Sequence, residues 1–299
     1  MKELVTAIIK KHYRSMPESI TRLDTFGGCS FRADFLKPPY RADVTLYRAP
    51  KLAENDAKLI TLFGKASVLK APMVYFVGGM RGTEYLITEH IDGIRASAVD
   101  PFSLPETIRE YIGASIIENL ISLHEISNSG GFGGVLDGKL FPTWEEYYYE
   151  VAAQAVAKAH FLCDKGFIAE RDAEVFDLSI KRFSDIFTVP VDHSSLLHGD
   201  YSVRNILLSP SKRDAVAVLN PFSCMWGDRE YDLCRLDSYG GFGYGLSEIY
   251  RSRIPLSPDF DKKSRFYALY SLIGQCFDLR INPDKAEVRL LSDSLREIL

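Results

Sequence analysis

The pattern of hydrophobic and polar positions changes once along the chain, near residue 92. Before that point, short runs of strand-forming residues alternate with turns rich in Gly and Pro, which is typical of β-structure. The runs lie at residues 20–26, 31–36, 43–47, 73–77 and 85–90. A first helix is expected at about residues 3–13, and apolar residues recur at helical spacing over residues 51–63. We therefore expect a small antiparallel sheet with one helix lying across it.

After Gly93 the pattern becomes helical. The helical segments lie at residues 104–126, 143–162, 168–187 and 260–280, with a last helix beginning near Pro283. Only two short β-type runs, Ile206–Leu208 and Ala215–Leu219, interrupt this pattern, and they flank a polar loop. The expected fold class is α+β, with a small N-terminal lobe over residues 1–92 and a larger, mainly α-helical lobe over residues 93–299.

Composition and charge exclude several classes of function. The chain carries 36 Lys and Arg against 40 Asp and Glu, a net charge of -4, so nucleic acid is not expected as a main partner. No apolar stretch approaches the roughly 18 residues of a membrane span, and the N-terminus lacks the features of a signal peptide. Five cysteines without paired spacing favour reduced thiols. We expect a cytoplasmic protein without membrane contact, and the sequence leaves monomer or dimer open.

The segment LLHGDYSVRNILL places a carboxylate, Asp200, a short distance before a carboxamide, Asn205. This is the spacing of kinase catalytic loops, in which the Asp orients the acceptor hydroxyl and takes its proton while the Asn offers a neutral oxygen to magnesium. Gly199 allows a tight backbone path, and His198 is expected to hold the loop through a hydrogen bond. The alternative for Asp200 and Asn205 is an Asx-type turn, because both residue types bond their own backbone.

A second polar segment, VLNPFSCMWGDREYDL, follows further along the chain. In it a β-type run ends in Asn220, at a place where a metal ligand is expected. The next residues, GDREYDL, are typical of a helix start. Asp228 and Asp232 are therefore expected to cap N–H groups and to brace the catalytic loop from beneath, rather than to act as catalysts.

These two segments resemble the aminoglycoside phosphotransferase and choline kinase superfamily, whose pattern is HGDxxxxN, then a strand ending in Asp, then GDxxxDL. The closer resemblance is to fructosamine (ketosamine) kinases. It is carried by FGGCS, FGGVLDG with TWEEYY, WGDREYDL, YGGFGYGLSEIY and FYALYSLI, which extend over most of the chain. The resemblance implies a protein-kinase-like bilobal fold that uses ATP and magnesium to phosphorylate a hydroxyl of a small or protein-bound sugar-amine acceptor.

The resemblance also implies roles for individual residues. Asp200 matches the catalytic base and Asn205 the first metal ligand, with Asn220 at the second metal position. The nucleotide-binding residues that it implies are Gly27, Gly28, Cys29 and Ser30 in a nucleotide-covering turn, Arg48 after the third strand, and Glu89 and Ile91 beside adenine.

The chain departs from the family pattern at charged positions. Asn220 replaces the second metal-binding Asp, so the site loses one negative charge. The Lys of the third strand has no counterpart, and Arg48 is the nearest cation. By spacing, the position of the acidic helix residue that should pair with this cation falls near Asn55, with Glu54 and Asp56 on either side, and the register stays open. Ser202 stands where fructosamine kinases usually have Trp.

These departures keep two other functions open. One is a nucleotide-binding protein with impaired catalysis, and the other is an O-phosphotransferase for aminoglycosides or amino alcohols. Trp144 and Trp226 are candidate walls of an acceptor pocket, whereas the tyrosines at residues 147–149 are more often core at such spacing. Cys29, in a turn expected to attract phosphate, is either redox-sensitive or an inert thiol.

Overall fold

The computed structural model describes residues 1–23, 29–136, 138–221, 223–279 and 281–299. The chain divides into two compact units. The first comprises Met1–Asn119 and Arg204–Phe222, and the second comprises Leu120–Val203 and Ser223–Leu299. The functional boundary expected at residue 92, between a nucleotide-binding lobe and a catalytic lobe, stays a prediction.

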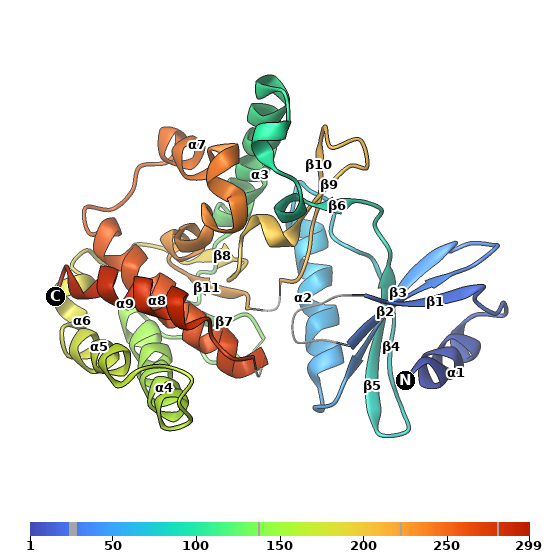
Figure 1. Cartoon of the computed structure of the whole chain (residues 1–299), viewed down its shortest axis with the longest axis horizontal. Coiled ribbons are helices and arrows are strands. Elements are labelled where there is room, and N and C mark those ends of the chain that lie inside the picture. The colour runs from blue at the N-terminus through green and yellow to red at the C-terminus, as the bar shows by residue number, and fades with distance from the viewer. Residues whose placement is uncertain (24–28, 137, 222, 280) are drawn as a thin grey trace. The chain divides into compact units, whose positions relative to one another are not determined.

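A five-stranded antiparallel sheet forms the centre of the first unit (Figure 1). Its strands are β1 (Ser19–Leu23), β2 (Cys29–Asp34), β3 (Arg41–Tyr47), β4 (Val74–Met80) and β5 (Thr83–Glu89). Their order is β1-β2-β3-β5-β4, and each neighbouring pair is antiparallel. The antiparallel sheet expected from the sequence is confirmed, although residues 24–26 of its first run lie outside the described residues.

Two helices cover opposite faces of this sheet (Figure 1). Successive side chains of a strand point to opposite faces, so neighbouring residues of β3 meet different helices. Val44 lies in the buried cluster that includes α1 (Lys2–His12), whereas Tyr47 packs against the cluster formed by α2 (Leu52–Ala66). The helix expected over residues 51–63 is confirmed, and it lies across the sheet as predicted.

A second, smaller sheet completes the first unit. Its strands are β6 (Ile94–Arg95), β9 (Ile206–Leu208) and β10 (Ala215–Val218), in the order β10-β9-β6, and two 3₁₀ helices, η1 (Ala96–Ala98) and η2 (Pro101–Ser103), follow β6. Strands β9 and β10 are the two β-type runs predicted from the sequence. Lys70, just after α2, joins this sheet through its backbone: its N–H donates to Val216 O at 3.2 Å, and its carbonyl accepts the Val218 N–H at 2.9 Å.

The second unit is mainly helical. Its helices are α4 (Trp144–Asp164), α5 (Glu170–Lys181), α6 (Phe183–Ile186), α7 (Leu246–Arg253), α8 (Phe260–Leu279) and α9 (Lys285–Arg296), with 3₁₀ helices η4 (Arg229–Arg235) and η5 (Ser238–Tyr244). Helix α3 (Glu106–His124) contains a boundary between the units. Three short strands, β7 (Gly133–Gly134), β8 (Ser195–Leu197) and β11 (Met225–Gly227), pair in the order β7-β11-β8.

Two sequence expectations for the chain after Gly93 are wrong. The helix expected over residues 168–187 is two helices, α5 and α6, divided at Arg182. The β-type runs after Gly93 are more than two, because β6, β7, β8 and β11 also form. Each of these strands has two or three residues, which is too short to show a period in the sequence.

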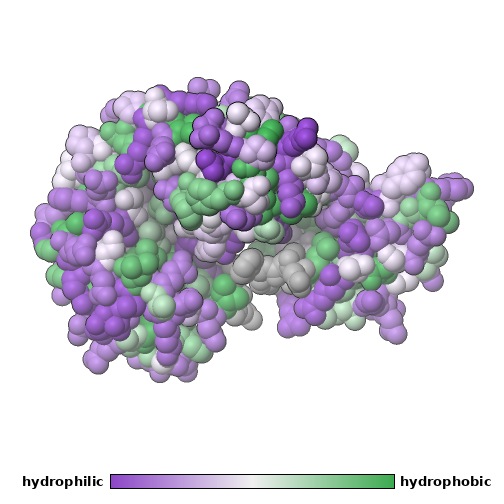
Figure 2. Space-filling model, turned by 45° about the horizontal axis from the view of Figure 1, so that its top comes forward, coloured by the Kyte–Doolittle hydropathy of each residue, from purple (hydrophilic) through white to green (hydrophobic). Residues whose placement is uncertain are grey.

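The surface carries hydrophilic residues over much of the face that Figure 2 shows, with hydrophobic residues scattered among them. Among the described residues, no helix combines the length and the apolar composition that crossing a membrane requires. All five cysteines have free thiols, as the spacing predicted.

Candidate active site

The loop after β8 is held by one buried carboxylate of the second unit. Asp232, in η4, accepts the backbone N–H groups of His198 and Gly199, each at 2.8 Å. It also contacts His124 Nε2 at 3.3 Å, and the other ring nitrogen of His124 lies 2.9 Å from the Tyr250 hydroxyl. Hydrogen bonds to an ionised group are stronger than neutral ones, so the loop backbone is firmly fixed here. The prediction that Asp232 braces the loop from beneath is confirmed.

Gly199 fits this loop because it has no side chain. Its φ of +81° lies in the left-handed region, and a Cβ there would be 2.0 Å from the carbonyl oxygen of Ser223. The adjoining His198 is fully buried, and its Nδ1 lies 3.3 Å from the backbone nitrogen of Asp200. The expected structural role of His198 is confirmed, and Asp200 emerges from this fixed backbone as a half-buried side chain.

A second buried cluster lies behind η4. Asp228 caps η4 by accepting the Glu230 N–H at 3.0 Å, as predicted, and its Oδ2 lies 2.8 Å from both Lys263 Nζ and the Tyr267 hydroxyl. Lys263 also contacts Glu230 at 2.7 Å and Asp259 at 3.5 Å. Burial alone would lower the pKa of Lys263, but the surrounding carboxylates raise it above its ordinary value. The charged side chains of this cluster are therefore paired with one another, and their role is structural.

The two asparagines expected at a metal site meet in the first unit. Asn205 ends the 3₁₀ helix η3 (Val203–Asn205), and its backbone carbonyl accepts the Leu219 N–H at 2.8 Å. The Asn220 carboxamide donates from Nδ2 to Asn205 Oδ1 at 2.9 Å. Asn220 has a φ of +58°, a left-handed conformation that Asn tolerates better than most residues. Asp200 belongs to the other unit, so the convergence of all three side chains stays a prediction.

Only part of the expected nucleotide-covering turn is described. Gly27 and Gly28 lie outside the described residues, whereas Cys29 and Ser30 begin β2. The Ser30 hydroxyl lies 2.9 Å from the hydroxyl of Thr45 on β3, and the Cys29 sulfur lies 3.2 Å from the sulfur of Met1. Hence Cys29 and Ser30, the last residues of the expected turn, belong to the sheet itself. Its contact with a nucleotide stays a prediction.

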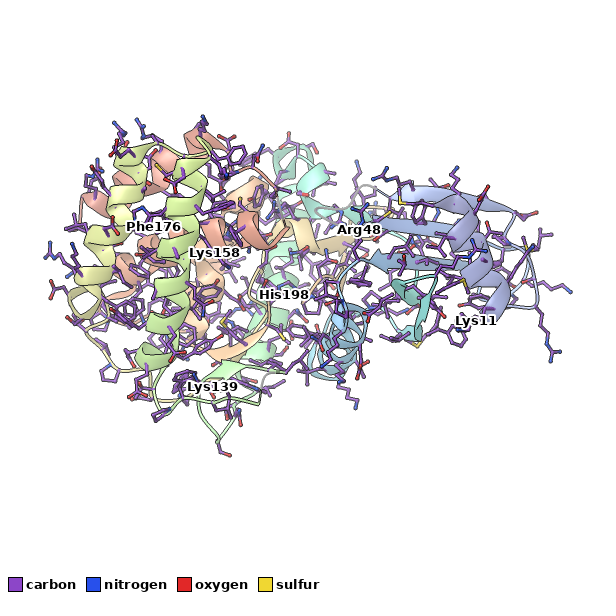
Figure 3. All side chains as sticks on the ribbon, turned by 90° about the horizontal axis from the view of Figure 1, so that it is seen from below. Lys11, Arg48, Lys139, Lys158, Phe176 and His198 are labelled. Carbon is purple, nitrogen blue, oxygen red and sulfur yellow. The ribbon has the colours of Figure 1, made fainter. Side chains whose placement is uncertain are left out.

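The other expected nucleotide-binding residues lie along β3 and β5. Arg48, labelled in Figure 3, follows β3 and is exposed; it lines an open cavity of about 450 Å³ together with residues 79–84 of the β4–β5 hairpin. Glu89 ends β5, where its N–H donates to Met73 O at 2.8 Å and its carboxylate pairs with Lys70. Ile91 is half-buried just beyond. Their roles towards ATP stay predictions.

The two tryptophans have different environments. Trp144 is fully buried in the aromatic core of the second unit, where its Nε1 donates to the Tyr267 hydroxyl at 2.7 Å and its ring stacks on Tyr148 at 4.9 Å. This burial assigns Trp144 and Tyr148 to the core. Trp226 is half-buried on β11, opposite Leu196 of β8. Both tryptophans stay predictions as acceptor-pocket residues, and of the two only Trp226 has part of its surface accessible.

Sequence reasoning missed several side chains that shape this region. His124 contacts Asp232 across 108 residues of chain, and Lys263 contacts Asp228 across 35. No local sequence pattern links residues so far apart. Arg235 of η4 is also buried, and its Nη1 donates to the Tyr239 hydroxyl at 3.2 Å. Burial would lower the pKa of this guanidinium, but nearby groups, Asp200 among them, raise it.

Solved structures similar to this one define the class of the fold. A candidate fructosamine-3-kinase of Haemophilus somnus matches with a TM-score of 0.74 and 18% identity, over 99% of this chain and 96% of that chain. The aminoglycoside phosphotransferase APH(4)-Ia, solved as a ternary complex with ADP and hygromycin B, matches with a TM-score of 0.72 and 14% identity, over 98% and 96% of the two chains. The fold is therefore the protein-kinase-like α+β fold of these phosphotransferases, as expected.

Sequence relatives identify the family. A probable ketoamine kinase of Pasteurella multocida is 23% identical over 274 residues, which cover 89% of this chain and 84% of that protein. A probable ketoamine kinase of Klebsiella aerogenes is 25% identical over 260 residues, covering 84% and 80%. The model of the fructosamine kinase family matches residues 45–279. The chain belongs to the fructosamine kinase family, which confirms the resemblance seen in its sequence.

Proposed function

We propose that the protein is an ATP-dependent small-molecule kinase that transfers the γ-phosphate to a hydroxyl of a sugar-amine acceptor of the ketoamine class. The observation that carries the proposal is the loop of His198, Gly199 and Asp200, whose backbone is fixed by the buried carboxylate of Asp232. Such fixed geometry is what phosphoryl transfer requires, since this reaction depends mainly on positioning and electrostatic stabilisation. Family membership and the names of the relatives support the acceptor class.

In this proposal Asp200 orients the acceptor hydroxyl and accepts its proton. The nucleotide is held by the turn of residues 27–30, with Arg48 at its phosphates and the backbone at Glu89 and Ile91 beside adenine. A solved structural neighbour binds ADP together with hygromycin B, which supports nucleotide binding on this fold. Trp226 and Trp144 are the candidate walls of the acceptor pocket, and the partly accessible Trp226 fits this role better than the fully buried Trp144.

Magnesium fits the asparagine pair as a neutral oxygen site. Asn205 and Asn220 offer carboxamide oxygens, a ligand type that Mg²⁺ accepts, and a carboxamide oxygen has a second lone pair that remains when it accepts one hydrogen bond. When bound, the ion would neutralise charge on the nucleotide phosphates. The residues of this chain supply no carboxylate within the pair, so its metal affinity is expected to be low.

The neutral pair favours a second candidate function, a nucleotide-binding protein with impaired turnover. In the pair, the Asn220 amide donates a hydrogen bond where the family pattern has a metal-binding carboxylate. A third candidate is phosphorylation of aminoglycosides or amino alcohols, because one fold serves several acceptors. The expected cytoplasmic location rests on the sequence alone and belongs to the same proposal.

The substitution Asp200→Asn tests the proposed function. We expect it to reduce magnesium-dependent ADP release on a panel of free and protein-bound ketoamines by about 10²–10⁴-fold, the usual contribution of a general base. Asp192→Asn, an exposed change earlier in the same unit, is the matched control and should keep full activity. Equal activity of the Asp200 variant and the wild type would contradict the kinase proposal. Tight ATP binding without ADP release from the wild type on any acceptor would favour the impaired kinase.

A further inference from the structure

The second unit has an open cavity beside the first turns of α4. Its volume is about 540 Å³, and its lining consists of three aromatic and three acidic side chains, those of Phe141, Tyr149, Phe183, Glu145, Glu146 and Glu150. Other residues of α4, Trp144 and Tyr148 among them, form the buried face of this helix. The cavity therefore lies along the outer side of α4, on a different face from the candidate acceptor residue Trp144.

The aromatic rings give the cavity surfaces that suit an organic cation. The rings of Tyr149 and Phe183 meet edge to face, with their centroids 5.3 Å apart. Tyr149 is 48% exposed, and Phe141 is half-buried. Ring faces attract cations because they carry partial negative charge, and the same rings pack well on alkyl groups. A ligand that enters from solvent would meet both kinds of surface here.

The acidic side chains make the cavity negatively charged. Glu150 pairs with Lys139 at 3.2 Å, whereas in the described part of the chain no cation lies within ion-pair distance of Glu145 or Glu146. Acidic residues in the first turn also stabilise a helix N-terminus, as Glu145 and Glu146 do in α4, but Glu150 lies beyond that turn. The lining therefore carries more negative than positive charge.

An ammonium group of the chain itself shows which ligand these side chains can bind. The Nζ atom of Lys139, a residue labelled in Figure 3, lies 4.2 Å from the ring centre of Phe141 while it pairs with Glu150. One ammonium thus contacts both a ring and a carboxylate of the lining. A metal ion fits less well, because among the described residues no three His, Cys, Asp or Glu side chains come close enough together to hold one.

We propose that this cavity binds an alkylammonium group, either the ε-ammonium of a lysine side chain in a peptide or one end of a free diamine. The carboxylates of Glu145 and Glu150 pair with the ammonium, and the ring of Tyr149 covers the alkyl chain behind it. Lys139 competes with the ligand for Glu150. The inference goes beyond the proposed function and does not depend on it, because this binding involves neither nucleotide nor phosphoryl transfer.

Two amine probes test the proposal on the full chain without nucleotide. Cadaverine and an acetylated trilysine peptide are titrated separately, with pentanediol as the neutral control for cadaverine. We expect backbone NMR shifts at residues 141–150 with at least one amine at about 1 mM, and none with the diol. Shifts with the peptide alone assign the site to lysine side chains, and shifts with cadaverine alone assign it to free diamines. No shifts with either amine at ~10 mM would overturn the proposal.

Removing two carboxylates should weaken this binding. In the double variant Glu145→Gln and Glu150→Gln, we expect the dissociation constant of the responding probe to rise about tenfold, because two ion pairs with the ligand are lost. The matched control is the double variant Glu170→Gln and Glu174→Gln, which removes two exposed carboxylates of α5 outside the cavity. Its dissociation constant should stay within about twofold of the wild type. Equal constants in the two double variants would contradict the site.

The ring of Tyr149 is tested by truncation. Tyr149→Ala should raise the dissociation constant about threefold, because the ammonium and its alkyl chain lose the ring. Phe161→Ala is the matched control, since Phe161 lies on the same helix, is equally exposed at 48%, and does not line the cavity. A rise of the same size in both variants would remove the ring from the site.

The competing ammonium of the chain gives an effect of opposite sign. Lys139→Met should lower the dissociation constant about threefold, because Glu150 then has no internal partner and positive charge is lost beside the ligand. Lys158→Met is the matched control: its Nζ lies 5.3 Å from the ring centre of Phe277, outside the cavity, and its removal should change little. Weaker or unchanged binding in Lys139→Met would refute an ammonium site at Glu150.

Discussion

The two units differ in how their polar side chains are paired. In the second unit, buried charges have several partners: Asp232 holds two loop N–H groups and His124, and Lys263 is surrounded by carboxylates. The first unit also has ion pairs, such as Lys70–Glu89, but its contact at the expected metal position is neutral. The Asn220 amide donates a hydrogen bond to Asn205, and burial raises the pKa of the Asp56 carboxyl to about 6.

A kinase active site needs a fixed catalytic loop and groups that balance the charge of the phosphates. Asp232 of the second unit fixes the backbone of the loop that carries Asp200, which is the fixed geometry that the proposed function requires. The neutral contact between Asn205 and Asn220 lies where the proposed function places the metal ion, so we expect weaker electrostatic stabilisation there.

The largest effect is expected from removing the buried cation of the second unit. Lys263→Met leaves three carboxylates, those of Asp228, Glu230 and Asp259, buried without their positive partner. Breaking a buried ion pair from one side costs about 3–5 kcal/mol, which urea unfolding at pH 7 would measure. Lys262→Met, at the exposed neighbouring position, should change the free energy of unfolding by less than about 0.5 kcal/mol. A loss of similar size in both variants would show that the cluster is not stabilising η4.

A smaller effect is expected from restoring a carboxylate in the first unit. Asn220→Asp adds the negative charge that the family pattern has beside Asn205, and a carboxylate is a stronger Mg²⁺ ligand than a carboxamide. With an ATP analogue bound, we expect the calorimetric affinity for Mg²⁺ to rise about tenfold, a change of ~1.4 kcal/mol.

Two comparisons make this measurement decisive. Asn282→Asp adds the same charge at an exposed position of the other unit and should leave the metal affinity unchanged. A gain in turnover together with the gain in Mg²⁺ affinity would identify the wild type as an impaired kinase. Unchanged metal affinity in Asn220→Asp would remove the asparagine pair from the metal site.

The fold was predictable wherever an element is long enough to show its period. Strand β3 and helix α2 each repeat their pattern over several residues, and both lie where the sequence predicted them. The two-residue strand β6 has no such pattern, because its formation depends on pairing with β9 far along the chain. The break at Arg182 was missed for a related reason, since hydrophobic residues continue on both sides of it.

The site was predictable only in its local parts. The spacing of Asp200 and Asn205, and the capping role of Asp228, lie within short segments that the sequence displays directly. Which acid of α2 faces the sheet depended on tertiary packing, because Glu54 and Asp56 lie within one helical turn. Contacts such as His124 with Asp232 join distant segments, and no residue pattern encodes them.

The smallest effect concerns the pH dependence of stability in the first unit. The pKa of Asp56 is about 6 in the folded protein, above its ordinary value of 3.8, because burial disfavours the ionised form. Asp56 therefore binds a proton more tightly in the folded protein than in the unfolded chain. The resulting contribution to stability is full below about pH 4 and is lost as the pH rises through 6.

Asp56→Asn removes this titration while keeping the size of the side chain. Relative to the variant, the wild type should lose about 2–4 °C of melting temperature between pH 4 and pH 7, the shift that ~1 kcal/mol produces in a chain of this size class. Glu54→Gln is the matched control on the exposed face, where pairing with Lys58 lowers the pKa instead. It should show no such loss. Parallel melting curves for the wild type and Asp56→Asn across this range would mean that Asp56 is ionised and solvated in the folded protein.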